Sequence, residues 1–268
     1  MSTTSEAPQE EGAPPAVDTQ GTVSQRTGYR SLGGYLLMPL LLAGVLALVW
    51  WSVSTRDLDS AEQGRLSFEN IVSQTQGHLK LTLASTVLVL LIAIPVGILL
   101  TRPFARPITP LAIGFFNIGQ AVPTIGLLAI FAIAWGIGFT PAVVALAAYT
   151  TLPVVRNTMV GLRLVDASVI ESARGMGMTK MSVLTRIELP LAVPVIMAGL
   201  RTALTINVGT ATLGAFIGVD CLGTLIVSGF SGNRPYISII GGILVAVLAL
   251  LVDYVAGIAE ERLRPRGL

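Results

Sequence analysis

ESARGMGMTKMSVLTRIELP, residues 171–190, is the longest charged segment that lies between clearly apolar runs of this chain. It carries acidic and basic side chains together with two closely spaced glycines, Gly175 and Gly177, which provide the backbone freedom for a tight turn. Charged side chains and loop backbone are costly in hydrocarbon, so such a segment between membrane spans must project into water. We therefore expect a loop that leaves the membrane here and returns to it. We call this loop, residues 166–190, the elbow.

Two short helical pieces are predicted on either side of the glycines. Asp166 or Ser168 can cap a first piece, residues 169–174, because their side chains accept hydrogen bonds from free backbone N–H groups. Thr179 can cap a second piece, residues 180–188, in the same way. The pattern therefore predicts helix, turn and helix within the elbow.

The residue order in this elbow resembles the EAA signature of ABC-importer permeases. That signature reads Glu-Ala-Ala, three residues, Gly, nine residues, Ile, one residue, Leu-Pro. The matching residues are Glu171, Ser172, Ala173, Gly177, Ile187, Leu189 and Pro190, and Gly175 lies within the same motif. Ser172 stands where the family usually has alanine, which exchanges one small residue for another.

Five short sequence segments in and around the elbow resemble the corresponding segments of permeases for the osmoprotectants glycine betaine, carnitine, choline and proline. They are RNT at 156–158, VDAS at 165–168, ARGMGMT at 173–179, ELPLAVPVIMAGLRTA at 188–203 and IGVDCLGTLI at 217–226. The resemblance covers about His78 to the C-terminus. One departure is Asp220-Cys221, where such permeases more often have two glycines.

The resemblance implies an all-α polytopic membrane protein with the MetI-like fold of type I ABC importer permeases. It implies that residues 166–190 form a coupling loop that docks on a cytoplasmic ATP-binding subunit, where ATP and magnesium would bind. It also implies a second permease subunit, either a copy or a paralogue, and an extracytoplasmic substrate-binding protein.

Composition independently indicates a membrane protein. Apolar residues make up 53% and charged residues 12% of the chain, and the mean hydropathy is +0.76, whereas soluble domains carry about 25% charged residues. The net charge of +2 is too small to indicate a nucleic-acid partner. The single cysteine, Cys221, excludes an internal disulfide, and the single histidine, His78, is expected to be interfacial and not a proton relay.

The sequence predicts no ATP hydrolysis by this chain and no cofactor or metal bound to it. A phosphate-binding loop of the form GxxxxGK[ST] does not occur. The nearest glycine pair, Gly175 and Gly177, lacks the preceding strand and the Lys-Ser/Thr ending. Transport energy must therefore enter through a partner, and the chain is not expected to be an enzyme.

The N-terminal region divides into a tail, a span and a loop. Residues 1–33 are polar and rich in Pro and Gly, so we expect a disordered tail. Residues 34–53 are expected to form an uncleaved first span, because the leader is long and acidic and lacks a small-x-small cleavage site. Residues 54–77 are mixed in charge and are expected to form an extracytoplasmic loop.

The permease core, residues 78–260, is expected to hold five further spans, giving six in total. As one helix, the uncharged run 107–155 would be about 70 Å long, more than twice the hydrocarbon thickness. It must fold back, and the glycines and proline at 136–141 mark the break. The expected spans are about 79–101, 110–135, 141–155, 191–219 and 236–259, with a short turn at 220–235.

Charge counting orients this layout in a cell membrane. A cytoplasmic N-terminus puts twelve Lys and Arg residues inside and four, Arg56, Arg65, Lys80 and Arg234, outside. The positive-inside rule then predicts that the tail at 261–268, the N-terminus and the elbow all face the cytoplasm.

Few polar groups mark a translocation path. Asn117 and Gln120 lie three residues apart on one helical face, and with Thr124 and Asn207 they are candidates to line the path. Hydrogen bonding between helices inside the bundle explains such groups equally well. Small residues also recur in the span 191–219, where pairing with a second permease and packing within one subunit both remain open.

Arg201 and Asp253 are charged residues within apolar runs. A mutual salt bridge or snorkelling is the preferred interpretation, and a substrate gate is the alternative. Taken together, the sequence predicts the permease subunit of an ABC importer for an osmoprotectant. Import of another small solute, such as an amino acid or a sulfonate, is the first alternative. A passive channel or a membrane scaffold is the second.

Overall fold

The computed structural model describes residues 32–263, with side chains described from Tyr35 onward. Every element in this range is helical and the range contains no strand, which confirms the all-α fold. Within it, residues 38–263 belong to one compact unit, and residues 32–37 belong to a separate one. The tail expected at 1–33 lies outside the described residues except for its last two, which begin the first helix.

Five helices of the described range are long and apolar enough to cross a membrane. Four of them are α1 (Leu32–Thr55), α3 (Phe68–Thr101), α6 (Phe139–Arg163) and α11 (Pro235–Leu263). The other is the continuous helical stretch Lys180–Ile217, whose longest part is α9 (Leu189–Ala211). Within lipid only a helix satisfies all backbone polar groups inside one segment, so long uncharged runs of this kind form helices. The final helix includes residues 261–263, which were expected to belong to the tail; residues 264–268 lie outside the described range.

The run expected as one straight span at 110–135 is bent in the structure. α4 (Thr109–Ala121) and α5 (Thr124–Trp135) meet at an angle of 97°. The cause is Pro123, which has no backbone N–H and holds Val122 in extended backbone at φ −76° and ψ 130°. The described range therefore holds six candidate spans only when this bent pair counts as one.

The fold-back expected at 136–141 is present. α5 ends at Trp135 and α6 begins at Phe139. Gly136 and Gly138 adopt φ values of 89° and 128°, which a residue with a Cβ rarely adopts. The two glycines thus make the reversal that the uncharged run required.

Two expected loops contain helices. The 54–77 segment holds α2 (Ser60–Arg65) and the start of α3, because Asp59 caps α2 by accepting a hydrogen bond from the backbone N–H of Glu62 at 2.8 Å. The Glu62 carboxylate accepts a return hydrogen bond from the Asp59 backbone. An ion pair with Arg234 also lowers the pKa of the Asp59 carboxyl.

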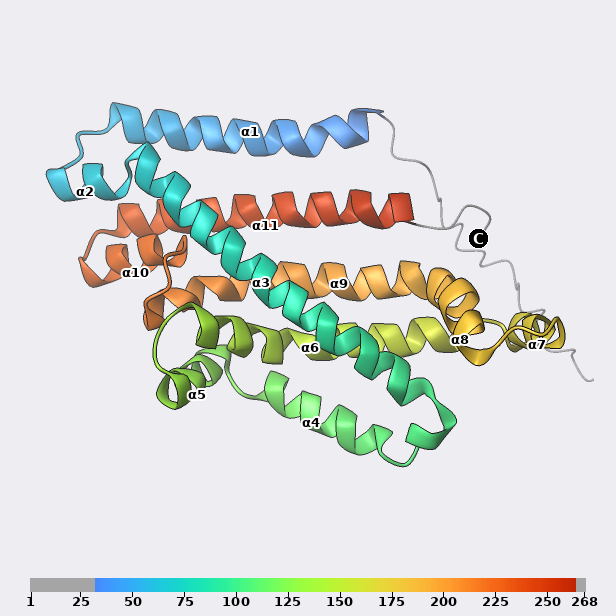
Figure 1. Cartoon of the computed structure of the whole chain (residues 1–268). Helices are drawn as coiled ribbons and strands as arrows, with labels where there is room; N and C mark the ends of the chain where they lie inside the picture. Colours follow the sequence, from blue (N-terminus) through green and yellow to red (C-terminus); the bar gives the residue numbers. More distant parts are fainter. Residues whose placement is uncertain (1–31, 264–268) are drawn as a thin grey trace, which may run out of the picture. The chain divides into compact units, whose positions relative to one another are not determined.

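The second of these loops, expected as a turn at 220–235, contains α10 (Gly223–Ser231). This helix is stabilised by packing against α11, since Leu225 is buried together with Ile237 and Ile240. Figure 1 shows α2 and α10 at one end of the bundle and α7 and α8 at the other.

The centre of the bundle is formed by α3, α6 and α9, and α11 packs on the far side of α9 (Figure 1). Glycines permit the close approach of these helices. A Cβ at Gly199 would lie 2.5 Å from the Cβ of Asn157, and one at Gly97 would lie 2.6 Å from the Cβ of Thr158. Both distances are shorter than real Cβ contacts, so these crossings admit only glycine without rearrangement.

His78 lies inside the bundle, and its expected position at the membrane interface stays a prediction. The side chain is fully buried, and its Nε2 lies 2.9 Å from the backbone oxygen of Val208. This carbonyl belongs to the last turn of α9, where the α-helix gives way to a 3-10 turn, Thr212–Ile217. His78 therefore links α3 to the end of α9 inside the bundle.

Replacing Gly199 by alanine is expected to destabilise the protein by about 1–3 kcal/mol, because the added methyl group overlaps Asn157 and the helices must separate. The matched control is Gly242→Ala in α11, where a Cβ meets nothing within 4 Å. Thermal unfolding of the two purified variants in detergent measures the stability of each relative to the wild type. Equal stability of the two variants would show that the α6–α9 crossing is not tight.

Candidate functional site

The elbow begins with α7 (Ala167–Gly175), which follows directly from the end of α6. Asp166 caps this helix as expected, since its carboxylate accepts a hydrogen bond from the Ser168 backbone N–H at 2.8 Å. The same hydrogen bond holds the pKa of the Asp166 carboxyl below its ordinary value. The polar Asp166 thus fixes the point at which the chain turns away from α6.

The turn of the elbow depends on Gly177. Its φ of 86° lies in the left-handed region, while Gly175 is the last residue of α7 and does not share this conformation. The backbone N–H of Met178 donates to the carbonyl of Ala173 at 3.2 Å, and that of Met176 donates to Ser172 at 3.0 Å. These hydrogen bonds satisfy carbonyls left free at the helix end, as in other glycine-terminated helices.

The second helical piece differs from the expected single helix at 180–188. α8 (Lys180–Val183) is capped by Thr179, which accepts from the Ser182 backbone N–H at 3.2 Å, as predicted. A π-helical turn, Leu184–Glu188, then leads without a break into α9. Single π turns are rare and occur frequently at functional sites. Leu189 and Pro190 open α9, so this end of the elbow is continuous with a membrane-spanning helix.

The elbow presents its signature residues to solvent. Glu171 and Ser172 are exposed on α7, as are Gly175 and Gly177, whereas Ala173 is buried against the rest of the elbow. Glu171 makes no ion pair with any residue in the described range. Two methionines project beside them, Met176 and Met181, with 78% and 68% of their surfaces exposed. Polar and apolar contacts are thus both offered at the tip.

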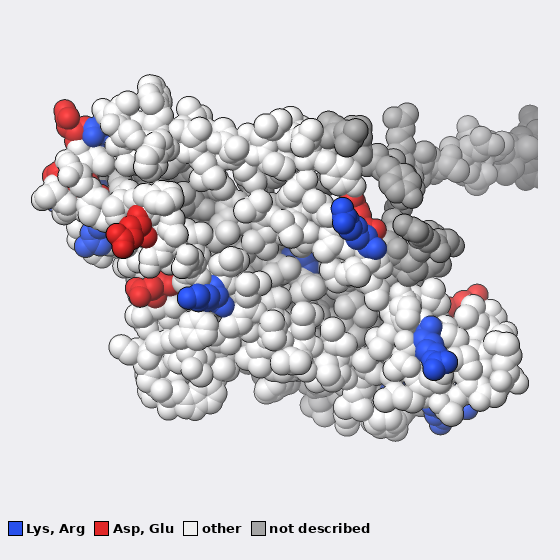
Figure 2. Space-filling model, turned by 45° about the horizontal axis from the view of Figure 1, so that its top comes forward, with Lys and Arg blue, Asp and Glu red and all other residues white. Residues whose placement is uncertain are grey.

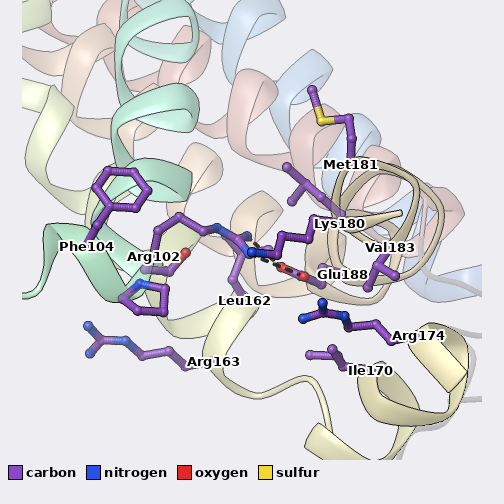
Figure 3. A pocket seen from close by; sticks show the side chains of 13 residues that line it. Arg102, Phe104, Leu162, Arg163, Ile170, Arg174, Lys180, Met181, Val183 and Glu188 are labelled. Carbon is purple, nitrogen blue, oxygen red and sulfur yellow. Dashed lines mark hydrogen bonds and ion pairs between the residues drawn. The ribbon is translucent and has the colours of Figure 1, made fainter. Parts of the chain in front are cut away.

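A cavity of about 600 Å³ lies between the elbow and the ends of α3 and α6. Its charged lining consists of Arg102, Arg163, Arg174, Lys180 and Glu188, and Phe104 borders it. We call this cavity the basic pocket. Figure 3 shows the side chains of Lys180 and Arg174 extending toward Glu188 from α8 and α7, with Arg163 beneath Arg102 on the other side.

An ion pair inside the basic pocket ties the π turn to the end of α3. Arg102 donates from Nη2 to Oε2 of Glu188 at 2.6 Å and from Nη1 to Oε1 at 3.3 Å (Figure 3). Glu188 is 7% exposed, so its carboxylate depends on this bidentate partner. The pair was not predicted from the sequence. Arg102 was expected only to end a span, and Glu188 only to belong to a charged loop.

The four residues considered for the path lie on three helices, α4, α5 and α9. Asn117 lies exposed on α4 and accepts a hydrogen bond from Arg156 at 3.0 Å. Gln120 is half-buried on the same helix, while Thr124 is buried beyond the Pro123 bend. The polar groups of α4 and α5 are therefore separated by the change in helix direction.

Asn207 is completely buried in α9 and bonds to two neighbouring helices. Its Oδ1 accepts from Thr150 in α6 at 3.1 Å, and its Nδ2 donates to Thr86 in α3 at 3.1 Å. Bonding between helices therefore accounts for Asn207 in this structure, and its place on a translocation path stays a prediction. Periodicity alone did not identify Thr86 and Thr150 as its partners.

Arg201 and Asp253 form the expected mutual salt bridge. Arg201 donates from Nε and Nη2 to the two carboxylate oxygens of Asp253 at 2.6 and 2.7 Å. Gly257 leaves room for the guanidinium, since a Cβ there would lie 3.3 Å from Nη1 of Arg201. The pair joins α9 to α11 within the apolar part of both helices.

Comparison with known proteins places this arrangement in one family. Residues 93–265 match the family described as "Binding-protein-dependent transport system inner membrane component", and this range contains α6, the whole elbow and α9. Among solved structures, a chain of the MetNI methionine ABC transporter in an inward-facing conformation has a TM-score of 0.64 and 24% identity. The likeness covers 74% of this chain and 98% of that one, and it shows a shared fold.

Curated relatives align over most of their length. The glycine betaine/carnitine/choline transport system permease protein OpuCB of Bacillus subtilis is 39% identical over 74% of this chain and 90% of its own. The choline transport system permease protein OpuBB of the same organism is 41% identical over the same shares. The osmoprotectant import permease protein OsmY of Salmonella typhimurium is 40% identical over 87% of this chain and 94% of its own. The chain therefore belongs to the family of inner membrane components of binding-protein-dependent transport systems.

Proposed function

We propose that this chain is the permease subunit of an ABC importer that takes up an osmoprotectant, such as glycine betaine, choline, carnitine or proline. The observation that carries the proposal is the alignment with osmoprotectant permeases at about 40% identity over at least 90% of their length. Permeases of this family work with an ATP-binding subunit and a substrate-binding protein, so the chain is one part of an assembly. A second permease subunit, identical or paralogous, completes the path.

The elbow is proposed to dock on the ATP-binding subunit and to transmit its movement. Exposed Met176 and Met181 provide an adaptable apolar contact, and Glu171 provides a charge that sets register. The π turn joins this contact directly to α9, and the Arg102–Glu188 pair joins it to α3. Movement of the docked elbow would therefore reach two central helices at once.

Both termini and the elbow are proposed to face the cytoplasm. Twelve of the Lys and Arg residues gather on that side in the charge count. On the face drawn in Figure 2, charged side chains lie mainly toward the two ends, with wide uncharged surface between them. Such a distribution suits a protein that crosses hydrocarbon and meets water at both ends.

The other transport functions have weaker support. The solved transporters for methionine and for amino acids are 24% and 20% identical to this chain, so their likeness extends to the fold and carries no substrate. A passive channel would need no docking elbow. The osmoprotectant importer accounts for both the elbow and the relatives.

Uptake of labelled substrates tests the proposed function directly. In a strain without its own osmoprotectant uptake, the chain with its ATP-binding and binding-protein partners is expected to accumulate at least one quaternary ammonium solute under salt stress. The control carries an inactivated ATP-binding subunit and should show no accumulation. Uptake restricted to an unrelated amino acid or sulfonate, or flux that survives ATPase inactivation, would contradict the proposal.

Gly177→Asp is expected to reduce ATP-dependent uptake at least tenfold without preventing membrane insertion. A residue with a Cβ is strained in the left-handed backbone at this position, and the added carboxylate places a negative charge at the surface that is proposed to dock. Gly175→Asp places the same charge two residues away on ordinary helical backbone and should lose much less. Initial uptake rates, normalised to the amount of protein in the membrane, compare the two variants, and equal loss would argue against a role for the turn.

Breaking the Arg102–Glu188 pair is expected to weaken both stability and coupling. Glu188→Gln or Arg102→Gln should each cost about 1–2 kcal/mol, a value reduced because Arg102 is partly exposed. The exchange of both charges, Arg102→Glu with Glu188→Arg, should recover part of the loss. Thermal unfolding and substrate-stimulated ATPase activity of the assembled importer measure these effects. Additive losses in the exchange variant would mean that the two side chains do not act as a pair.

A further inference from the structure

The basic pocket holds more positive charge than the described residues, 32–263, neutralise. Arg102 is engaged by Glu188. Arg163, Arg174 and Lys180 also line the cavity, and none of them forms an ion pair with a residue in the described range. Like charges grouped around one cavity repel each other, and an anion placed between them would relieve that repulsion.

The margin of the basic pocket is apolar. Phe104 lies beside Arg102 and is 72% exposed, and Met181 on the opposite side is 68% exposed (Figure 3). A small soluble anion gains nothing from such a margin. A molecule with an anionic head and an apolar body gains from both the cations and the exposed apolar surface.

The position of the cavity suits a lipid. It lies where α3 and α6 end and the elbow begins, which is the boundary between hydrocarbon and water at the cytoplasmic side under the proposed function. Basic pockets between membrane helices on this side bind anionic headgroups. The volume of about 600 Å³ is within the range of cavities that enclose small molecules.

We propose that the basic pocket binds the phosphate headgroup of an anionic phospholipid from the cytoplasmic leaflet. Arg163, Arg174 and Lys180 hold the phosphate, and Phe104, which lies outside the elbow, contacts the glycerol and the upper acyl chains. Because the cations come from α6, α7 and α8, the bound lipid bridges the elbow to the end of the bundle. The proposal rests on the proposed function for the side of the membrane that the pocket faces.

Lipid binding to the purified importer in detergent tests the proposal without requiring transport. The probes are phosphatidylglycerol and phosphatidylcholine with identical acyl chains, and glycerol phosphate as the soluble anion. Retention of each by the intact complex is measured by native mass spectrometry. The expected result is preferential retention of phosphatidylglycerol, which glycerol phosphate does not displace.

Substitutions of the lining cations test whether the phospholipid binds in the basic pocket. Arg163→Gln should reduce the preference for phosphatidylglycerol about fivefold, and Arg163→Gln with Lys180→Gln should reduce it further, since each cation near the headgroup contributes separately. Arg163→Lys keeps the charge and should keep most of the preference, which separates loss of charge from loss of folding. Arg106→Gln is the matched control, because Arg106 is an exposed cation in the α3–α4 connection outside the pocket lining.

Equal retention of the two lipids by the wild type would overturn the proposal. Wild-type preference in the Arg163→Gln, Lys180→Gln double variant would also overturn it, as would displacement by glycerol phosphate, which would indicate a soluble anion. A failure of osmoprotectant uptake accompanied by normal lipid preference would count against the proposed substrate and leave the lipid site standing.

Discussion

The rest of the structure depends on one constraint, which is that charged side chains cannot remain in hydrocarbon without partners. Between α6 and α9 the chain carries Glu171, Arg174, Lys180 and Arg186 within sixteen residues, so it must leave the membrane there. The uncharged runs on either side must return to the membrane as helices, because no other form satisfies their backbone. The elbow and the spans that flank it are consequences of the same distribution of charge.

The elbow is connected to the three central helices of the bundle, as its proposed coupling role requires. One side is continuous with α9 through a π turn, and the other follows α6 after a three-residue connection that ends at the Asp166 cap. The Arg102–Glu188 pair adds α3. These three helices also pack at glycine-permitted distances in the centre of the bundle, so displacement of the elbow cannot be absorbed by loose packing. An anion in the basic pocket would stiffen the same junction.

The sequence predicted features that depend on local chemistry. The caps at Asp166 and Thr179 and the glycine turn at 136–141 follow from short-range hydrogen bonding and backbone freedom, and the structure contains all three. The bend at Pro123 was not predicted, because the run around it is apolar throughout and the two glycines at 136 and 138 give a stronger turn signal. α10 was missed because its stability comes from α11, which no local pattern reveals.

Features that depend on distant contacts were beyond the sequence. Arg102 and Glu188 are separated by 86 residues, and their pairing follows from the way α3 crosses the bundle. Asn207 suited either a path or a helix junction by its polarity alone, and its hydrogen bonds to Thr86 and Thr150 appear only in the folded bundle. Likewise Arg163, Arg174 and Lys180, which form no ion pair within residues 32–263, come from separate helices and form a group only in three dimensions.

The side of the membrane on which the elbow lies is the most direct test of this account. Met176→Cys introduces a thiol at the tip of the elbow, where the native side chain is 78% exposed, while the native Cys221 is buried. A membrane-impermeant maleimide applied to sealed vesicles should label this thiol only when the cytoplasmic face is outward, and a bound ATP-binding subunit should protect it. Labelling from the opposite face would contradict the account, because the elbow would then lie out of reach of any cytoplasmic ATPase.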